Sequence, residues 1–228
     1  MRRRRIKRWL IAPVFVLAVA ALAALWWPAV DAAAPELAGV RIVAQVATQP
    51  GYDRSCASGH QCVFGPAWSD DVRVRWGHDG CDTRNQVLAR DLTKVVTKPG
   101  TRGCVVLAGV LRDRYSGAVI EFTRAAGNQV PVDHVVALAS AWDRGAASWD
   151  SQLRRDFAND PDNLTATTRA VNSAKRDKTP ATWAPTTRAG ACWYVRTYLT
   201  IVRRYDLTVT VAEALALVRT LRDCQTTP

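Results

Sequence analysis

The spacing of hydrophobic residues predicts a series of short strands and helices beyond residue 52. Residues 105–111 form an apolar run short enough for a buried strand, and residues 118–124 alternate between apolar and polar positions. The sequence Arg-Asp-Arg-Tyr-Ser-Gly between them is rich in turn formers, so the two runs predict a β-hairpin. Within residues 81–96 the apolar positions recur at helical spacing, which predicts a helix there.

The centre of the chain carries a second group of short elements. The run that contains Asp133 is β-branched and is entered through Pro131, which is typical of a strand, and Pro180 ends the last helix of the group. The predicted central elements are strands at 130–136 and 163–167 and helices at 138–144, 149–157 and 168–177.

Two amphipathic helices are predicted near the C-terminus. The second opens with Thr210 and Glu213 three residues apart, the pattern of a capping box. The predicted helices are 193–205 and about 210–224. Together with the strands they indicate one α+β domain over residues 53–228, preceded by a linker or an initial strand at 35–52.

The first 34 residues have the pattern of an export signal. A basic run, Arg2–Arg8, precedes an apolar stretch at 9–27, and small residues close the segment at Ala34. Pro35 is a poor residue to follow a cleavage site, and the apolar stretch approaches the length that spans a bilayer. Both a cleaved signal peptide and an uncleaved membrane anchor therefore stay open. Either one predicts a domain that is secreted or anchored on the extracellular side.

Six cysteines fit an exported chain, because an even number in an oxidising compartment indicates disulfides. Six cysteines allow fifteen pairings, and their order along the chain favours Cys56–Cys62, Cys81–Cys104 and Cys192–Cys224. The competing interpretation is a zinc site formed by Cys56, Cys62, His78 and Cys81. This spacing does not match paired C-x-x-C knuckles, so disulfides are the preferred prediction.

Composition and charge narrow the function classes. Hydrophobic residues make up 48% and charged residues 22% of the chain, which excludes intrinsic disorder for the bulk of it. The net charge is +11, and about +6 is left when residues 1–34 are set aside, because they carry six basic residues and Asp31. The positive charge of residues 35–228 favours a polyanionic partner, which would be DNA and/or RNA.

The polar residues Asp133, His134 and Asn172 lie in a predicted strand–strand–helix arrangement. Hydrolysis of a phosphodiester needs a base to activate water and a cation on the scissile phosphate. His134 is suited to the base, while Asp133 and Asn172 offer hard oxygen ligands for Mg²⁺ or Mn²⁺. Adjacent side chains of a strand point in different directions, so Asp133 and His134 cannot readily bind the same ion. This favours Asp133 as the metal ligand and His134 as the base.

The helix that contains Asn172 also carries basic residues. Asn172, Lys175 and Arg176 lie three and four residues apart, hence on one face, which predicts that Lys175 and Arg176 bind nucleic-acid phosphates beside the metal. Each of these residues taken alone has a plain structural interpretation. An Asp-His pair is common, and the basic residues could form a solvated helix end. The order and spacing of these residues as a group favour the functional interpretation.

The segments DHVVAL and NLTATTRAVNSAKRD resemble the HNH core of the D-H…N…N-x-x-K type, found in RNA-guided CRISPR nucleases and in relatives of the C-terminal part of GmrSD restriction enzymes. With CDTRNQVLARDL, DRYSG, DHVVALASAWDRGAASWD, RRDFANDPDNL and CWYVRTYLTIVRRYDLT, the resemblance extends to a family of exported bacterial HNH proteins. It implies a ββα-metal core at about 130–178, with flanking helices, an N-terminal hairpin and disulfides.

The resemblance also implies roles for individual residues. Asp133 and Asn172 would bind one divalent ion, His134 would be the general base, and Asn163 would brace the loop. Lys175 matches the lysine of the family and completes the expected catalytic set. Arg114 departs from the pattern, because proline is expected there, and this departure concerns the geometry of the turn.

The function predicted from the sequence is that of an exported, metal-dependent HNH endonuclease that cuts DNA and/or RNA and acts as a monomer. The alternative is a non-catalytic extracellular module that binds nucleic acid. A third class, a disulfide-rich surface interaction domain, predicts neither metal dependence nor nucleic-acid binding. The basic charge supports the first two equally, and the set Asp133, His134 and Asn172 favours the enzyme.

Overall fold

The computed structural model describes residues 34–127 and 130–225. The chain divides into two units, Met1–Gly39 and Val40–Pro228, and the described part of the first holds the 3-10 helix η1 (Pro35–Leu37). The helices of the second are α2 (Thr83–Asp91), α3 (Leu138–Asp143), α4 (Ser151–Ala158), α5 (Arg169–Lys175), α6 (Arg188–Arg204) and α7 (Val211–Gln225), with 3-10 turns η2 (Arg124–Ala126), η3 (Ala146–Ser148) and η4 (Pro161–Asn163). Its strands are β1 (Arg41–Val43), β2 (Leu92–Thr97), β3 (Val106–Arg112), β4 (Val119–Thr123), β5 (Val132–His134), β6 (Leu164–Ala166) and β7 (Thr208–Thr210).

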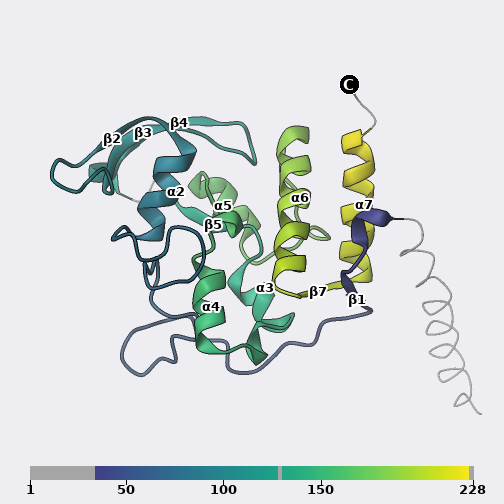
Figure 1. The fold of residues 1–228 in the computed structure, drawn as a ribbon. Helices are drawn as coiled ribbons and strands as arrows, with labels where there is room; N and C mark the ends of the chain where they lie inside the picture. Colours follow the sequence, from purple (N-terminus) through teal and green to yellow (C-terminus); the bar gives the residue numbers. More distant parts are fainter. Residues whose placement is uncertain (1–33, 128–129, 226–228) are drawn as a thin grey trace, which may run out of the picture. The chain divides into compact units, whose positions relative to one another are not determined.

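The predicted hairpin is β3–β4, which β2 extends to a three-stranded antiparallel sheet (Figure 1). The helix predicted at 81–96 is wrong beyond Asp91. There α2 ends, and Leu92–Thr97 forms β2, with Leu92 opposite Leu111 of β3. The run Leu-Thr-Lys-Val-Val-Thr is rich in β-branched residues, and pairing with β3 outweighs the helical spacing of its apolar positions.

Helix α2 joins this sheet to the centre of the domain. Asp82 caps it by accepting a hydrogen bond from the backbone N–H of Asn85. Val87 and Leu88 on its inner face are completely buried. They share one hydrophobic core with residues of the sheet and of the central strands, namely Leu92, Val106, Leu111, Phe122, Val130, Val132, Leu164 and Ala166.

The central strands β5 and β6 form an antiparallel pair in which Asp133 lies opposite Thr165. Helix α5 follows β6 directly, and the Thr168 side chain caps it by accepting from the backbone N–H of Val171. The predicted strand–strand–helix order is therefore present. Between β5 and β6 lie α3 and α4, close to their predicted positions.

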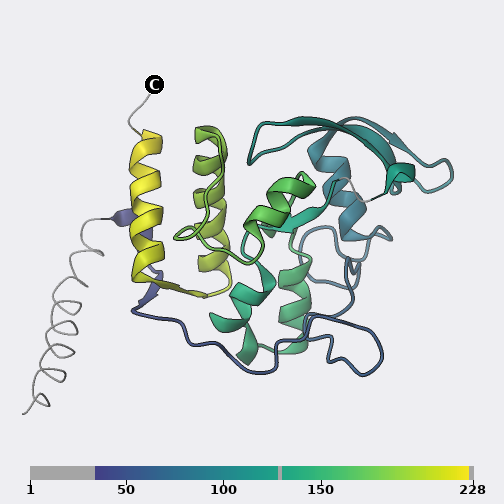
Figure 2. The same cartoon turned by 180° about the vertical axis from the view of Figure 1, so that it is seen from behind.

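Helices α6 and α7 lie side by side in both views (Figures 1 and 2). The capping box of α7 is confirmed, because Glu213 accepts from the Thr210 backbone N–H and Thr210 Oγ1 accepts from that of Glu213. Helix α6 begins at Arg188, earlier than the predicted residue 193, where the side chain of Thr187 caps it. Strand β7, which the hydrophobic pattern did not indicate, pairs in parallel with β1.

Three disulfides have the predicted pairing, Cys56–Cys62, Cys81–Cys104 and Cys192–Cys224. No cysteine is left free, so the zinc interpretation of Cys56, Cys62, His78 and Cys81 is wrong. The chain is thus a mixed α and β protein with three disulfides. The first bridge closes a short loop, the second ties the start of α2 to the sheet, and the third joins α6 to α7.

The predicted export signal at 1–34 and the possible anchor at 9–27 lie outside the described residues, except for Ala34. Across residues 34–127 and 130–225, the structure has no helix that is both long enough and apolar enough to traverse a bilayer.

Candidate functional site

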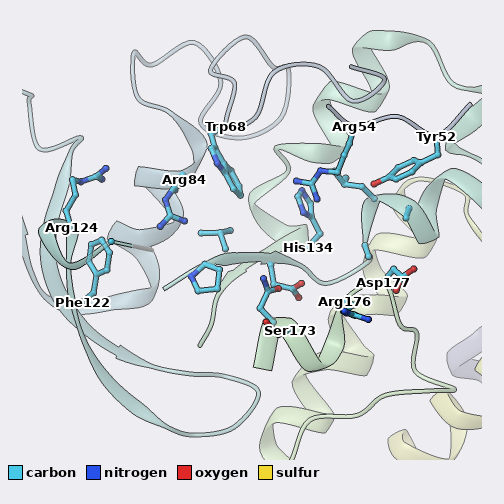
Figure 3. Close-up of a pocket in the computed structure, with 18 residues that line it drawn as sticks. Tyr52, Arg54, Trp68, Arg84, Phe122, Arg124, His134, Ser173, Arg176 and Asp177 are labelled. Atoms are coloured by element: carbon cyan, nitrogen blue, oxygen red, sulfur yellow. The ribbon is translucent and has the colours of Figure 1, made fainter. Parts of the chain in front are cut away.

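Asp133, His134 and Asn172 line one cavity of about 840 Å³ (Figure 3). Asp133 and His134 reach it from β5, and Asn172 reaches it from α5, so the strand–strand–helix arrangement brings the three predicted residues together. The charged residues that also line the cavity are Arg54, Arg84, Arg124, Arg176 and Asp177.

Asp133 is a buried carboxylate with two protein partners. The Tyr115 hydroxyl donates to its Oδ2 at 2.8 Å, and Lys175 Nζ lies 3.1 Å from Oδ1 and 3.0 Å from Oδ2. Burial raises the pKa of Asp133; Lys175 and the Tyr115 hydroxyl oppose this, and the charge of Asp113 adds to it. An ionised carboxylate accepts at about four positions, so these contacts leave room for a further ligand.

The turn between β3 and β4 places Tyr115 beside Asp133. Asp113 Oδ1 accepts from the backbone N–H groups of Tyr115 and Ser116, so the turn forms with arginine at position 114. Helix α6 packs closely on it. A Cβ at Gly190 would lie 2.6 Å from the carbonyl oxygens of Arg114 and Tyr115, which only glycine permits. The sequence marked this segment as a turn and gave Tyr115 no role.

His134 has one ring nitrogen engaged and one available. Its Nε2 lies 2.8 Å from the carbonyl oxygen of Ala158. A carbonyl only accepts, so Nε2 carries the hydrogen and Nδ1 keeps a lone pair. Burial lowers the pKa of His134 to about 4, the bond to Ala158 acts in the opposite direction, and the charges of Arg54 and Lys175 add to the lowering. The ring is therefore neutral near pH 7.

The ring of Trp68 lies nearly parallel to that of His134, at an interplanar angle of 11° and 6.3 Å between centroids. Both rings line the cavity. The sequence did not single out Trp68, because an isolated tryptophan in a loop carries no periodic signal. The two rings are parallel and offset, an arrangement that aromatic pairs favour.

Asn163 and Asn172 occupy different environments. Asn163 is completely buried, where its Oδ1 accepts from the backbone N–H of Val136 at 2.8 Å and its Nδ2 donates to the Val136 carbonyl at 3.2 Å. These contacts hold the segment that follows β5 in place. A catalytic role for Asn163 stays a prediction. Asn172 is half-buried and lines the cavity, and its side chain makes no hydrogen bond within the described ranges.

The predicted contact between Lys175 and phosphate disagrees with the burial of this side chain. It is completely buried, and its Nζ donates to the His134 carbonyl at 2.7 Å as well as to Asp133. The side chain therefore points inward from α5, and a nucleic-acid backbone cannot reach it. Arg176 is exposed and lines the cavity, so the structure leaves only the second half of the predicted basic pair available to phosphate.

The cavity offers few side chains to a divalent ion. Among the described residues there is no group of three or more His, Cys, Asp or Glu side chains that could hold a metal. Zinc is normally held by at least three such ligands, whereas Mg²⁺ keeps several waters and takes one or two carboxylates plus substrate phosphates. Asp133, with its remaining acceptor position, and the amide of Asn172 fit the second kind of site.

Comparison with known proteins gives two matches. The family described as GmrSD restriction endonucleases, C-terminal domain, matches residues 82–220, which include the whole strand–strand–helix region. An "Uncharacterized secreted protein" of Arthroderma benhamiae is 41% identical over 146 residues, which are 63% of this chain and 68% of that protein. No solved structure matches the chain.

Proposed function

We propose that this chain, which belongs to the family of GmrSD restriction endonuclease C-terminal domains, is an exported, metal-dependent endonuclease of the HNH type that hydrolyses DNA and/or RNA. The family is nuclease-related, and the finer assignment is inferred from the site. The secreted fungal relative and the three disulfides support an extracellular location.

One observation carries the proposal: a neutral His134, with Nε2 bonded to Ala158 and a lone pair left on Nδ1, lines the same basic cavity as Asp133 and Asn172. A general base must be unprotonated at the working pH and must have a lone pair free for the proton it removes. The bond from Nε2 to Ala158 fixes the tautomer that satisfies both conditions.

The chain's own residues divide the reaction between them. His134 accepts a proton from water at Nδ1 while the water oxygen forms a bond to phosphorus and the P–O bond to the leaving group breaks. The leaving oxygen takes a proton from solvent, which yields one phosphate end and one hydroxyl end, and His134 later returns its proton to solvent. Asp133 and Asn172 would hold Mg²⁺ or Mn²⁺, which stabilises negative charge on the phosphate and the leaving oxygen when bound. Arg176 would orient the backbone.

The deciding experiment is cleavage of labelled DNA and RNA with and without EDTA. Cleavage is expected to need added Mg²⁺ or Mn²⁺ and to stop on chelation, because two protein ligands hold the ion weakly. Binding is measured separately by fluorescence anisotropy in EDTA. Binding without cleavage at any metal concentration would support the non-catalytic module instead, and cleavage that survives exhaustive chelation would contradict the HNH assignment.

The contact from Tyr115 to Asp133 gives a sharper test. Tyr115→Phe keeps the ring and removes the hydroxyl that orients the carboxylate. We expect cleavage to fall by about 10- to 100-fold, or the metal concentration for half-maximal rate to rise by that factor, as for other residues that orient a metal ligand. The measurement is a metal titration of the cleavage rate.

Tyr194→Phe is the matched control. The Tyr194 ring contacts that of Tyr115, and its buried hydroxyl has no hydrogen-bond partner in the described part of the chain. Its removal should leave the metal titration unchanged. Equal effects of the two substitutions would indicate a packing role for Tyr115 in place of orientation of Asp133.

A further inference from the structure

Arg84 and Arg124 lie on the same side of the cavity, Arg54 lies beside His134, and Arg176 lies on the opposite side (Figure 3). Neither Arg84 nor Arg124 belongs to the strand–strand–helix region. Arg84 comes from the first turn of α2, and Arg124 follows directly after β4. The sequence pattern assigned no function to either residue.

Each of the two guanidinium groups donates to a backbone carbonyl. Arg84 Nη2 donates to the Val130 carbonyl at 2.9 Å. Arg124 Nε donates to the Val106 carbonyl at 2.7 Å, and its Nη2 donates to Oδ1 of Asn85. Asn85 is only 4% exposed and is fixed in turn by the carboxylate of Asp82. Arg124 therefore uses two of its five N–H donors and keeps the others for a ligand.

The two positive charges are close enough to oppose each other. Burial lowers the pKa of Arg84, and the nearby charge of Arg124 lowers it further, against the effect of Asp82. The carboxylates that line the cavity are Asp133, already paired with Lys175, and Asp177, which lies on the far side with Arg176 (Figure 3). Two neighbouring guanidinium groups at one end of the cavity are suited to one anion with several acceptor oxygens.

We infer that Arg84 and Arg124 form a phosphate-binding subsite that holds an internucleotide phosphate next to the scissile one. The inference rests on the proposed nuclease function and extends it, because the substrate is then a polynucleotide with phosphates on both sides of the cut. The strand runs from this subsite past Asp133 and His134 toward Arg54 and Arg176. The subsite raises affinity for the polymer and takes no part in the bond that breaks.

Binding in EDTA tests the subsite without cleavage. The double variant Arg84→Gln/Arg124→Gln is compared with the wild-type full chain on fluorescent oligonucleotides that lack terminal phosphates. We expect Kd to rise about tenfold or more, as for the loss of hydrogen bonds to a charged group. The slope of log K against log salt should fall in magnitude by about 0.7–0.9, the value for one phosphate.

Arg112→Gln is the matched control. This exposed arginine ends β3 in the same sheet and does not line the cavity, so it removes one charge without touching the subsite. Because Arg124 also supports Asn85, thermal unfolding of every variant is measured. Arg84→Lys/Arg124→Lys keeps both charges and should retain the salt slope while losing part of the affinity.

A single-phosphate substrate separates the subsite from the scissile site. Bis(p-nitrophenyl) phosphate has one diester, so its kcat/KM with Mn²⁺ should change less than about twofold in the double glutamine variant, while KM for the oligonucleotide rises. An equal loss on both substrates would place the pair on the scissile phosphate and overturn the subsite. An effect confined to oligonucleotides with a terminal phosphate would show an end-binding pocket instead.

Failure of the proposed function and failure of the subsite alone give different results. A wild-type chain that binds no nucleic acid would overturn the proposed function together with the subsite. A wild-type chain that binds, with unchanged affinity and salt slope in the double variant, would overturn the subsite alone and leave the nuclease proposal standing.

Discussion

His134→Ala is expected to lower phosphodiester cleavage by at least about a hundredfold, because it removes the Nδ1 lone pair that accepts the proton from water. The expected fall is in kcat, since the cavity arginines that we propose as contacts of the backbone are unchanged. Nucleic-acid binding in EDTA should stay within a few-fold of wild type. The measurement is the initial cleavage rate under saturating metal and substrate.

His78→Asn is the control for this experiment. His78 is exposed and adopts a positive φ of 60°, a backbone conformation that asparagine tolerates well. It lies outside the cavity lining, so its replacement should leave the rate unchanged. A His134→Ala variant that cleaves at nearly the wild-type rate would rule out His134 as the base, whatever its pKa.

Lys175→Met should destabilise the fold by about 3–5 kcal/mol, because it leaves the buried carboxylate of Asp133 without its counter-charge. Methionine occupies a similar volume, so the loss comes mainly from electrostatics and from the hydrogen bond to the His134 carbonyl. The free energy of unfolding is measured by urea denaturation in EDTA. The exposed neighbour Lys178, replaced by methionine, should change this free energy by less than about 0.5 kcal/mol.

Two further measurements identify the cause of this loss. Lys175→Met combined with Asp133→Asn removes both charges and should recover much of the stability. Burial raises the pKa of the Asp133 carboxyl group in the folded chain, so the folded state binds the carboxyl proton more tightly than the unfolded state does. Ionisation of Asp133 at neutral pH therefore lowers the stability of the fold. Lys175 lowers that pKa. The defect of Lys175→Met should therefore shrink as the pH falls, and a defect independent of pH would point to packing.

The local order of elements was predictable because it depends on neighbours in the sequence. The alternation at 118–124 predicted β4, and the residue types Thr210 and Glu213 predicted the capping box of α7. The segment Leu92–Thr97 shows the limit of this reasoning. Its apolar spacing is helical, and only the pairing with β3, in which Leu92 lies opposite Leu111, makes it a strand.

Some residues of the candidate site were also predictable from the sequence, and others were not. Asp133, His134 and Asn172 were predicted from residue types in a strand–strand–helix order, and they line one cavity. The roles of Tyr115 and Arg84 were not predictable, because each comes from an element outside that order and reaches the site only through packing. Asp113 and Gly190 position the turn that carries Tyr115, and the core around α2 positions Arg84.

The sequence by itself determined the strand–strand–helix order and the identity of the central polar residues, since these follow from local spacing and side-chain chemistry. It favoured one pairing of the cysteines, and the structure confirmed that pairing. Tertiary structure alone decided which charges face solvent. Lys175 and Arg176 are adjacent in sequence, yet one is buried against Asp133 and the other lines the cavity. The reason is that burial depends on what other elements bring to each face of a helix, and that information lies far away along the chain.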